Sequence, residues 1–326
     1  MVVDKMVFGF LQLLKLRLAL HVAKPSIRLF APLLLQYAAV VLAMSPLPIS
    51  AQSISINDNL GNHVSIPKPA EKIIALSPHV VELLFSLGAG DKVIATIEYA
   101  DYPPQAKKIK RIGDAMSVNF EELIALKPDL VVAWGKGTQF SLIEKLKRFG
   151  IPVFLSGSSS LQDIPSSLQS LGQLTGNVDK ADKLVDKFNS SVKKLKVTKQ
   201  AERPGVFIQI WGSPLRTIGG GHIVDEIISH CGGRNIYKDQ QQLSPVVSIE
   251  SLMKRDPQII VLNNNPEGFS REISELIKPW MKIDAVTNKN YCKVDFDMLL
   301  RPTLRVLDAM DVICGCINNN MQSKKN

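Results

Sequence analysis

Two stretches of the chain, VNFEELIALKPDLVVAW (Val118–Trp134) and VSIESLMKRDPQIIVL (Val247–Leu262), contain the same parts in the same order. Each has a residue that can cap a helix, then an acid, a short amphipathic run, a proline and a run of aliphatic residues. Glu121 and Glu250 both stand seven positions before that proline. The amphipathic run predicts a helix and the aliphatic run a buried strand. A chain that carries this unit twice is expected to contain two lobes of similar construction.

Short aliphatic strands and amphipathic helices alternate on both sides of each copy. The expected strands are KIIALS, DKVIATIEY, LVVAW and IPVFLS in the first half, and VFIQIWG and IIVLN in the second. Strands without polar alternation, separated by helices, indicate parallel sheets covered on both faces. Between the halves, residues 178–197 place apolar side chains at helical spacing without a break. We therefore predict an α/β fold of two Rossmann-like lobes with parallel sheets, joined by a single long interlobe helix.

The expected boundaries are a signal peptide 1–51, an N-terminal α/β lobe 52–177, an interlobe helix and linker 178–203, a C-terminal α/β lobe 204–318 and a polar tail 319–326. In the first segment, basic residues end at Arg28 and 16 largely apolar residues follow. That run is shorter than the roughly 20 residues that span a bilayer. Cleavage is expected after Ala51, and the alternative is an uncleaved membrane anchor. Because no cysteine stands near this point for lipid attachment, we expect a periplasmic protein.

The composition is that of a globular protein, with 45% hydrophobic and 21% charged residues. The net charge is +9, of which +4 belongs to residues 1–51, so a small basic surplus is spread over the rest. This distribution argues against nucleic-acid binding. The chain has no G-x-S-x-G motif and no P-loop, and its GGGH turn at residues 219–222 is a weak signal alone. We therefore predict a protein that is not an enzyme, with no catalytic residue and no metal site.

Aromatic residues stand at the ends of three expected strands. Tyr99, Trp134 and Trp211 hold these positions, and Tyr102 follows in the DYPP turn. In α/β folds, ligands bind beyond the carboxyl ends of the strands. Each aromatic residue could instead fill the core at the end of its sheet. Four of them at one edge favour the walls of a cleft between the lobes.

Several motifs then connect the chain to a known family. LSPHVVELLFSLGAG, EYADYPP, LKPDLVVAW, CGGRNIY and DMLLRPTLR resemble the periplasmic vitamin B12-binding proteins of ATP-driven importers, over about Lys72 to Ile317. These proteins belong to a class with a rigid interlobe helix that also carries siderophores and haem. The resemblance implies a monomer that captures cobalamin in an interlobe cleft and delivers it to membrane permease subunits. Cobalamin would be transported cargo, and no cofactor is expected.

Carried over residue by residue, the resemblance implies a set of ligand-binding positions: Ser77, Pro78, His79, Tyr99, Tyr102, Trp134, Trp211, Asp297 and Arg301. Flat aromatic faces suit the broad corrin ring, and Asp297 and Arg301 would reach its amide arms. His79 and His222 lack partners at metal-ligand spacing, so hydrogen bonding is the expected role of both. The chain departs from some family members in having Ala115 and Met116 where those have a tryptophan.

The resemblance also assigns Glu121 and Glu250 to docking, one acid of each lobe meeting arginines of the permease. The alternative is that each acid only stabilises its own helix, because negative charge is favourable in a first turn. This alternative explains each residue separately but not their matching places in the repeat.

Four cysteines, Cys231, Cys292, Cys314 and Cys316, allow three full pairings, and spacing alone does not choose among them. One or two disulfides suit an exported protein. The resemblance implies the pair Cys231–Cys314 and leaves the other two unassigned. Within the same class, the alternative ligand is an iron-siderophore or haem, for which Tyr99 would be a candidate iron ligand.

Overall fold

A computed structural model describes residues 53–157, 159–195, 203–264 and 282–323. The expected signal peptide, 1–51, lies outside these ranges. Residues 52–326 form one compact unit. Among the described residues, no helix has both the length and the apolar character to cross a membrane.

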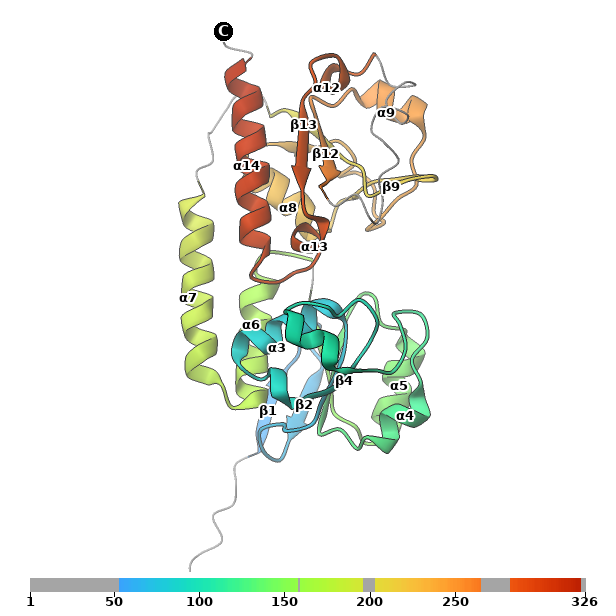
Figure 1. The fold of residues 1–326 in the computed structure, drawn as a ribbon, viewed down its shortest axis with the longest axis vertical. Coiled ribbons are helices and arrows are strands. Elements are labelled where there is room, and N and C mark those ends of the chain that lie inside the picture. Colours follow the sequence, from blue (N-terminus) through green and yellow to red (C-terminus); the bar gives the residue numbers. More distant parts are fainter. Residues whose placement is uncertain (1–52, 158, 196–202, 265–281, 324–326) are drawn as a thin grey trace, which may run out of the picture. The chain divides into compact units, whose positions relative to one another are not determined.

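The first lobe is built on a five-stranded parallel sheet in the order β5-β4-β3-β6-β7 (Figure 1). Its strands are β3 (Ile73–Leu76), β4 (Val93–Thr96), β5 (Lys110–Arg111), β6 (Leu130–Trp134) and β7 (Val153–Ser156). The connecting helices are α3 (Pro78–Leu87), α4 (Phe120–Ala125), α5 (Phe140–Arg148) and α6 (Asp163–Thr175), with short 3-10 turns η2 (Gly90–Lys92) and η3 (Pro104–Lys108). All of β3 and β7 is buried, as expected of aliphatic strands covered on both faces.

Residues 53–69 contain the antiparallel hairpin of β1 (Ile54–Asn57) and β2 (His63–Ile66). Val64 and Ile66 are buried, whereas His63 and Ser65 between them are exposed. This alternation is the period of a half-buried strand.

The second lobe has a four-stranded parallel sheet in the order β11-β8-β12-β13. Its strands are β8 (Gly205–Ile208), β11 (Arg234–Asn235), β12 (Ile259–Asn263) and β13 (Tyr291–Val294), and β9 (Trp211–Gly212) and β10 (Leu215–Arg216) form a separate hairpin. The helices are α8 (Ile223–His230), α9 (Ile249–Arg255), α12 (Asp284–Thr287) and α13 (Phe296–Leu299). The repeated unit forms α4 and β6 in one lobe and α9 and β12 in the other. In each sheet its strand pairs with the lobe's leading strand, β3 or β8.

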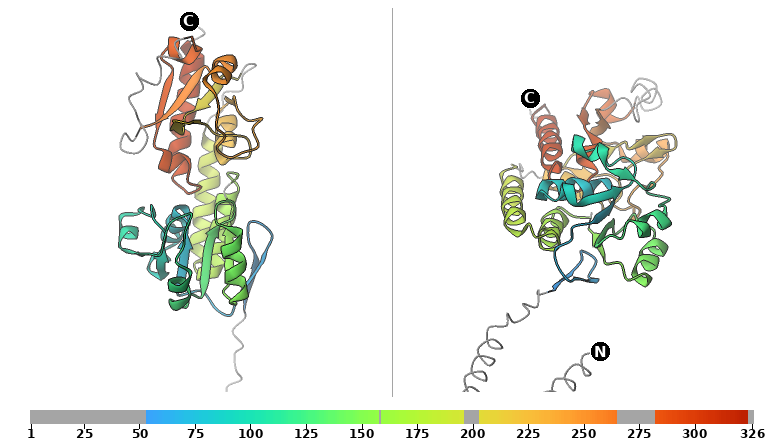
Figure 2. Two further views of the ribbon diagram at one scale, coloured as in Figure 1. Left: turned by 90° about the vertical axis from the view of Figure 1, so that its right-hand side faces the viewer. Right: turned by 60° about the horizontal axis from the view of Figure 1, so that its bottom comes forward.

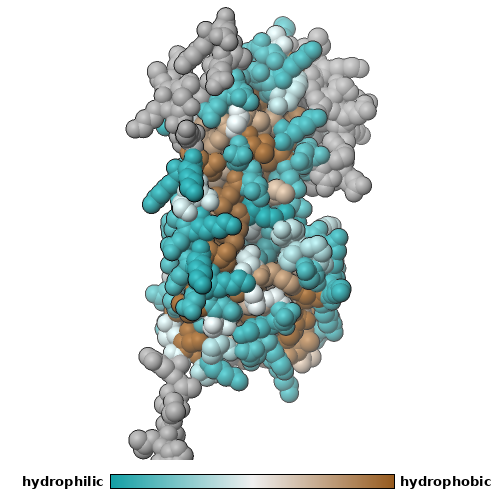
Figure 3. All heavy atoms as spheres, turned by 60° about the vertical axis from the view of Figure 1, so that its left-hand side comes forward, coloured by the Kyte–Doolittle hydropathy of each residue, from teal (hydrophilic) through white to brown (hydrophobic). Residues whose placement is uncertain are grey.

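The long helix α7 (Val178–Lys194) packs against α6 of the first lobe and against the last helix, α14 (Val306–Ser323) (Figures 1 and 2). Ala181, Val185 and Phe188 make its buried face, while Val178 is exposed. On the side of α7, Figure 3 shows a largely hydrophilic surface with a band of apolar side chains. The predicted fold of two parallel-sheet lobes joined by one long helix is confirmed. Helix α14 continues to Ser323, past the expected end of the lobe at 318.

Two disulfides fix α14 to the rest of its lobe. The expected pair Cys231–Cys314 is present and joins the end of α8 to α14. Cys292–Cys316, which the sequence left unassigned, joins β13 to the same helix. Both bonds attach the C-terminal helix to elements that precede it by many residues.

Candidate functional site: an interlobe cleft

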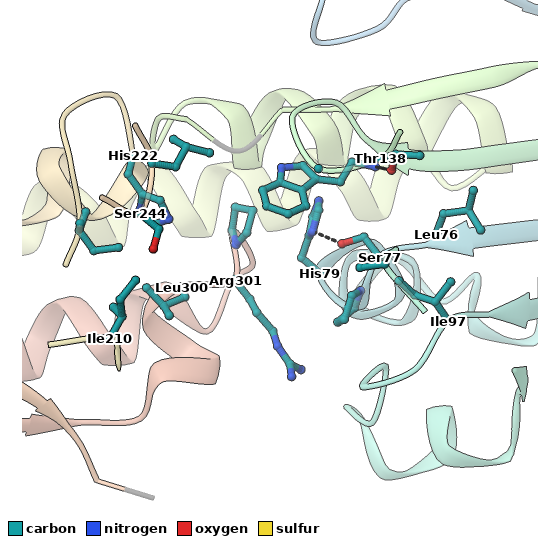
Figure 4. Close-up of a pocket in the computed structure, with 17 residues that line it drawn as sticks. Leu76, Ser77, His79, Ile97, Thr138, Ile210, His222, Ser244, Leu300 and Arg301 are labelled. Atoms are coloured by element: carbon teal, nitrogen blue, oxygen red, sulfur yellow. Dashed lines mark hydrogen bonds between the residues drawn. The ribbon is translucent and has the colours of Figure 1, made fainter. Parts of the chain in front are cut away.

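A cavity of about 340 Å³ lies between the two lobes (Figure 4). The first lobe contributes Leu76, Ser77, Pro78, His79, Ile97, Ala115, Trp134, Gly137 and Thr138, and the second contributes Ile210, Ile218, His222, Leu243, Ser244, Leu300, Arg301 and Pro302. Leu76 and Trp134 are the last residues of β3 and β6. The cavity therefore begins where ligands bind in parallel α/β sheets, beyond the carboxyl ends of the strands. Its lining is mainly apolar, with few polar groups.

Trp134 supplies the aromatic surface of the first-lobe wall. Its ring meets His79 edge to face, with ring centroids 6.3 Å apart and planes at 84°. A Cβ atom at Gly137 would lie 1.7 Å from the Trp134 ring, so only glycine at that position leaves room for the indole. The sequence WGKG thus places a flat apolar face at the cavity.

His79 is buried at the start of α3 and lines the cavity. Its Nδ1 atom is 2.5 Å from Ser77 Oγ and its Nε2 atom is 3.3 Å from Ser156 Oγ. Burial, together with the positive charge of Arg301, lowers the pKa of His79 to about 3. The imidazole is therefore neutral at physiological pH, and both of its ring nitrogens already have hydrogen-bond partners.

His222 occupies the opposite wall as the N-cap of α8. Its Nδ1 atom accepts a hydrogen bond from the Val224 backbone N–H at 3.1 Å. Burial and the charge of Lys136 lower its pKa to about 4. A neutral ring whose Nδ1 accepts must carry its proton on Nε2, so His222 is a hydrogen-bond donor. The preceding GGGH turn requires glycine for close backbone packing, because a Cβ atom at Gly219 would lie 2.0 Å from the Gln242 carbonyl oxygen.

Arg301 lines the cavity from the second lobe, and acids of both lobes hold its guanidinium. Its guanidinium lies 3.0 Å from Glu82, 3.2 Å from Asp101 and 3.0 Å from Asp297. Glu82, on α3 of the first lobe, is only 2% exposed. It also accepts two hydrogen bonds from Arg305, each 2.8 Å long. Glu82, Asp101, Asp297, Arg301 and Arg305 thus form an ion network between the two lobes.

The structure gathers part of the predicted ligand-binding set around this cavity. Ser77, Pro78, His79, Trp134 and Arg301 line it. The predicted residues that are not among its lining are Tyr99, Tyr102, Trp211 and Asp297. The assignment of all nine to ligand binding stays a prediction.

The positions of these four residues have local explanations. Tyr99 is 78% exposed and follows β4 by three residues, because that strand ends at Thr96. Trp211 is 42% exposed and begins the hairpin beyond β8, where its Nε1 donates to the Ser213 carbonyl. The Tyr102 ring packs against the Arg305 guanidinium, 3.9 Å from the ring centroid. Asp297 is exposed and pairs with Arg301.

Sequence reasoning missed several lining residues. Ile97 and Ile210 come one and two positions after β4 and β8, so the strand-end rule would have found them with correct strand limits. Leu300 and Pro302 flank the predicted Arg301. The Leu243 and Ser244 segment carried no motif, and only the folded chain brings it to the cavity.

Glu121 and Glu250 occupy the same position in their two helices. Each is the second residue of its helix, α4 or α9, and each is exposed. The N-caps also correspond, because Asn119 and Ser248 each accept a hydrogen bond from the backbone N–H three residues on, at 3.1 Å in both cases. Backbone and Ser248 hydrogen bonds lower the pKa of Glu250. Among the described residues, no group of three or more histidine, cysteine or acidic side chains is placed to hold a metal ion.

This chain is similar to several known binding proteins. A vitamin B12-binding protein of Vibrio cholerae serotype O1 is 33% identical over 250 residues, which are 76% of this chain and 89% of that protein. The structure is similar to that of the periplasmic vitamin B12 binding protein BtuF of Vibrio cholerae, with a TM-score of 0.71, 32% identity, and coverage of 78% of this chain and 99% of that one. A possible iron-binding (periplasmic solute-binding) protein from Staphylococcus epidermidis gives a TM-score of 0.64 and 31% identity, with coverage of 77% and 99%.

The family model described as periplasmic binding protein matches residues 73–305, which is more than half of the chain. Its span includes both sheets, the long helix and every residue that lines the cleft cavity. The chain therefore belongs to the periplasmic binding protein family.

Proposed function

We propose that this protein captures vitamin B12 (cobalamin) in the interlobe cleft and delivers it, unchanged, to the permease of an ATP-driven importer. The observation that carries the proposal is the cavity between the lobes, to which the first lobe contributes Trp134 and the second contributes the donors Arg301 and His222. Relatives at about one-third identity that are named vitamin B12-binding proteins support the choice of ligand.

The chemistry of the cavity suits a corrinoid. A corrin is a broad apolar ring that carries amide arms, so it needs apolar contact area and a few hydrogen-bonding groups. The lining is mainly apolar, and each aromatic side chain can bury about 150–250 Å². Burial of apolar surface contributes roughly 25 cal/mol per Å² before the cost of ordering both partners. The cavity volume is near the lower end of the usual range of about 300–1,000 Å³, so part of a corrinoid would extend beyond it.

An iron-siderophore or haem is the alternative ligand, and two features of the cleft weigh against it. Arg301, the cation that lines the cavity, is already paired with three carboxylates, which leaves little positive charge for an anionic siderophore. Neither histidine that lines the cleft has an unprotonated, unoccupied ring nitrogen with which to bind haem iron. His79 uses both ring nitrogens, and His222 carries its proton on the nitrogen that does not cap α8.

The direct test is purification of the protein from cells supplied with vitamin B12, followed by a visible absorption spectrum. We expect a red protein with the spectrum of a bound corrinoid. A haem Soret band or a ferric-siderophore charge-transfer band would instead establish the alternative ligand. Dialysis against a ligand-free buffer, followed by titration with pure cobalamin, distinguishes specific binding from carry-over.

A further inference from the structure

A second cavity, of about 390 Å³, lies where the two lobes meet α7. Three parts of the chain line it: α3 and the DYPP turn of the first lobe, one face of α7, and the segment 303–308, which includes the start of α14. It shares no lining residue with the cleft cavity. Its volume is within the range of about 300–1,000 Å³ that is typical of small-molecule sites. We call this cavity the hinge pocket.

Apolar side chains make up part of the lining of the hinge pocket. Leu184 and Phe188 stand four positions apart on α7, so they lie on one face of that helix. Leu304 and Leu307 line the pocket from the second lobe. Phe188 belongs to the hydrophobic core, and the three leucines pack against that core. The pocket therefore offers a fixed apolar surface that would remove the hydrocarbon part of a ligand from water.

Two exposed side chains of opposite charge also line the hinge pocket, one on each of two neighbouring helices. Lys187 is on α7, on the same face as Leu184 and Phe188, and Asp308 is in the first turn of α14. In the ranges that the structure describes, neither forms an ion pair. A cation and an anion that line one cavity without pairing can each bind an opposite charge of the same ligand.

The remaining charged residues of the lining, Glu82 and Arg305, bind each other. Arg305 donates two hydrogen bonds to the Glu82 carboxylate, each 2.8 Å long, and its guanidinium packs on the Tyr102 ring. Two acids and two bases thus line the pocket, and their charges sum to zero. A ligand with a net charge would pair with Lys187 or Asp308 and meet a like charge at the other, which opposes its binding.

We propose that the hinge pocket binds a small zwitterion with an apolar side chain, either a free amino acid or a short peptide. Its carboxylate would pair with Lys187 and its ammonium group with Asp308, while its side chain would pack on Leu184, Phe188 and Leu307. Such a ligand would contact α7 and the second lobe at once. The site is separate from the cleft and does not depend on which ligand the cleft binds.

Titration calorimetry of the purified protein with L-leucine and with leucyl-leucine tests the proposal. We expect at least one of them to bind, and the tighter one identifies a free amino acid or a peptide as the ligand. Its methyl ester lacks the carboxylate and its N-acetyl form lacks the ammonium group, so each should bind about fivefold more weakly or worse. Equal affinity for all three forms, or no binding of either zwitterion, would overturn the proposal.

Two charge variants identify which group meets which residue. Lys187→Met should weaken binding of the zwitterion about fivefold without affecting the methyl ester, which has no carboxylate to lose. Asp308→Asn should weaken the zwitterion to a similar degree without affecting the N-acetyl form. Lys193→Met and Asp311→Asn, at exposed positions of the same two helices outside the lining, are the matched controls. Losses in the controls as large as in the pocket variants would contradict the assignment.

A third variant fills the pocket. Ser191→Phe places a ring at a lining position of α7, and Ser190→Phe places the same ring at the exposed neighbouring position outside the lining. We expect Ser191→Phe to weaken zwitterion binding about tenfold or more and Ser190→Phe to leave it within about twofold. Unchanged circular dichroism establishes that both variants fold. Equal affinities would refute the site, whereas a failure of the unsubstituted protein to bind cobalamin would refute only the proposed function.

Discussion

Arg301 and His79, which line the cleft, have contact partners that lie far from them in the sequence. Arg301 faces the cavity, yet its guanidinium already contacts Glu82, Asp101 and Asp297. A guanidinium has five N–H groups, so it can hold these acids and still donate toward a ligand. His79 is fixed in the same way between Ser77 and Ser156. Both side chains are oriented before any ligand arrives.

The buried state of His79 predicts a pH dependence of stability. Its folded pKa, about 3, lies below the value near 6.5 of an unfolded chain. Between these values the unfolded chain binds more protons, so stability falls as pH drops below about 6.5. From pH 7 to pH 5 this residue should cost about 2 kcal/mol of unfolding free energy.

Urea unfolding of the unsubstituted protein and of His79→Gln, at pH 7, 6 and 5, measures this effect. The variant should lose less stability over that range, whatever its stability at pH 7. His63→Gln, which replaces an exposed histidine of β2, is the control and should keep the original slope. Identical slopes for all three proteins would contradict the assignment.

The C-terminal helix is attached to the second lobe both by packing and by covalent bonds. Helix α14 buries Val306, Met310, Ile313 and Ile317 and carries one cysteine of each disulfide. The bonds close loops of different lengths, with sequence separations of 83 and 24 residues. The longer loop is expected to restrict the unfolded chain more.

Removal of the disulfides should therefore destabilise the protein unequally. Cys231→Ala with Cys314→Ala should lower the unfolding free energy by roughly 4.5 kcal/mol, and Cys292→Ala with Cys316→Ala by roughly 3.5 kcal/mol. Denaturant titration under oxidising conditions measures both losses. In the presence of a reductant all three proteins should converge, and a difference that persists would mean that packing, not cross-linking, causes the loss.

In the whole molecule, polar contacts join the two lobes in addition to α7. Glu82 of the first lobe binds Arg301 and Arg305 of the second, and Glu226 of the second accepts a hydrogen bond from the Leu161 backbone N–H of the first at 2.7 Å. A single helix with such contacts resists bending, so we expect modest lobe motion. The resemblance alone implied a rigid interlobe helix, and the ion network adds a second physical reason.

Glu82→Gln tests the network. Removal of the buried Glu82 charge leaves two partly buried arginines without their shared partner, so we expect a loss of roughly 3–5 kcal/mol of unfolding free energy. Glu122→Gln is the matched control, because Glu122 pairs at 2.6 Å with the exposed Lys110 and should cost at most about 1 kcal/mol. Chemical denaturation compares the two, and similar small losses would mean that the network contributes little.

The matching positions of Glu121 and Glu250 predict a defect in transport alone. Both are exposed first-turn acids, one on each lobe, as expected of charges that meet two permease subunits. Replacing both with alanine should abolish uptake and leave ligand affinity unchanged. Asp179→Ala removes a first-turn acid of α7 with the same helix-dipole effect and should leave uptake normal. Reduced affinity in the double variant would refute the docking assignment.

The two lobes could be predicted from local sequence, because continuous aliphatic runs between amphipathic helices form buried parallel strands with little dependence on distant residues. The local sequence also placed Trp134 correctly at the end of β6, where the strand and the motif end together. Which other side chains reach the cavity depends on the folded chain. Thr96 and Ile208 end their strands earlier than the aliphatic pattern suggests, so Ile97 and Ile210 line the cavity and Tyr99 and Trp211 do not.

The partners of Arg301 likewise came only from the folded chain. Glu82 is 219 positions away in sequence, and the contact depends on how two separately formed lobes meet. Local periodicity specifies each helix and strand. The orientation of one lobe relative to the other depends instead on packing along α7 and α14, and no short stretch of sequence encodes that packing.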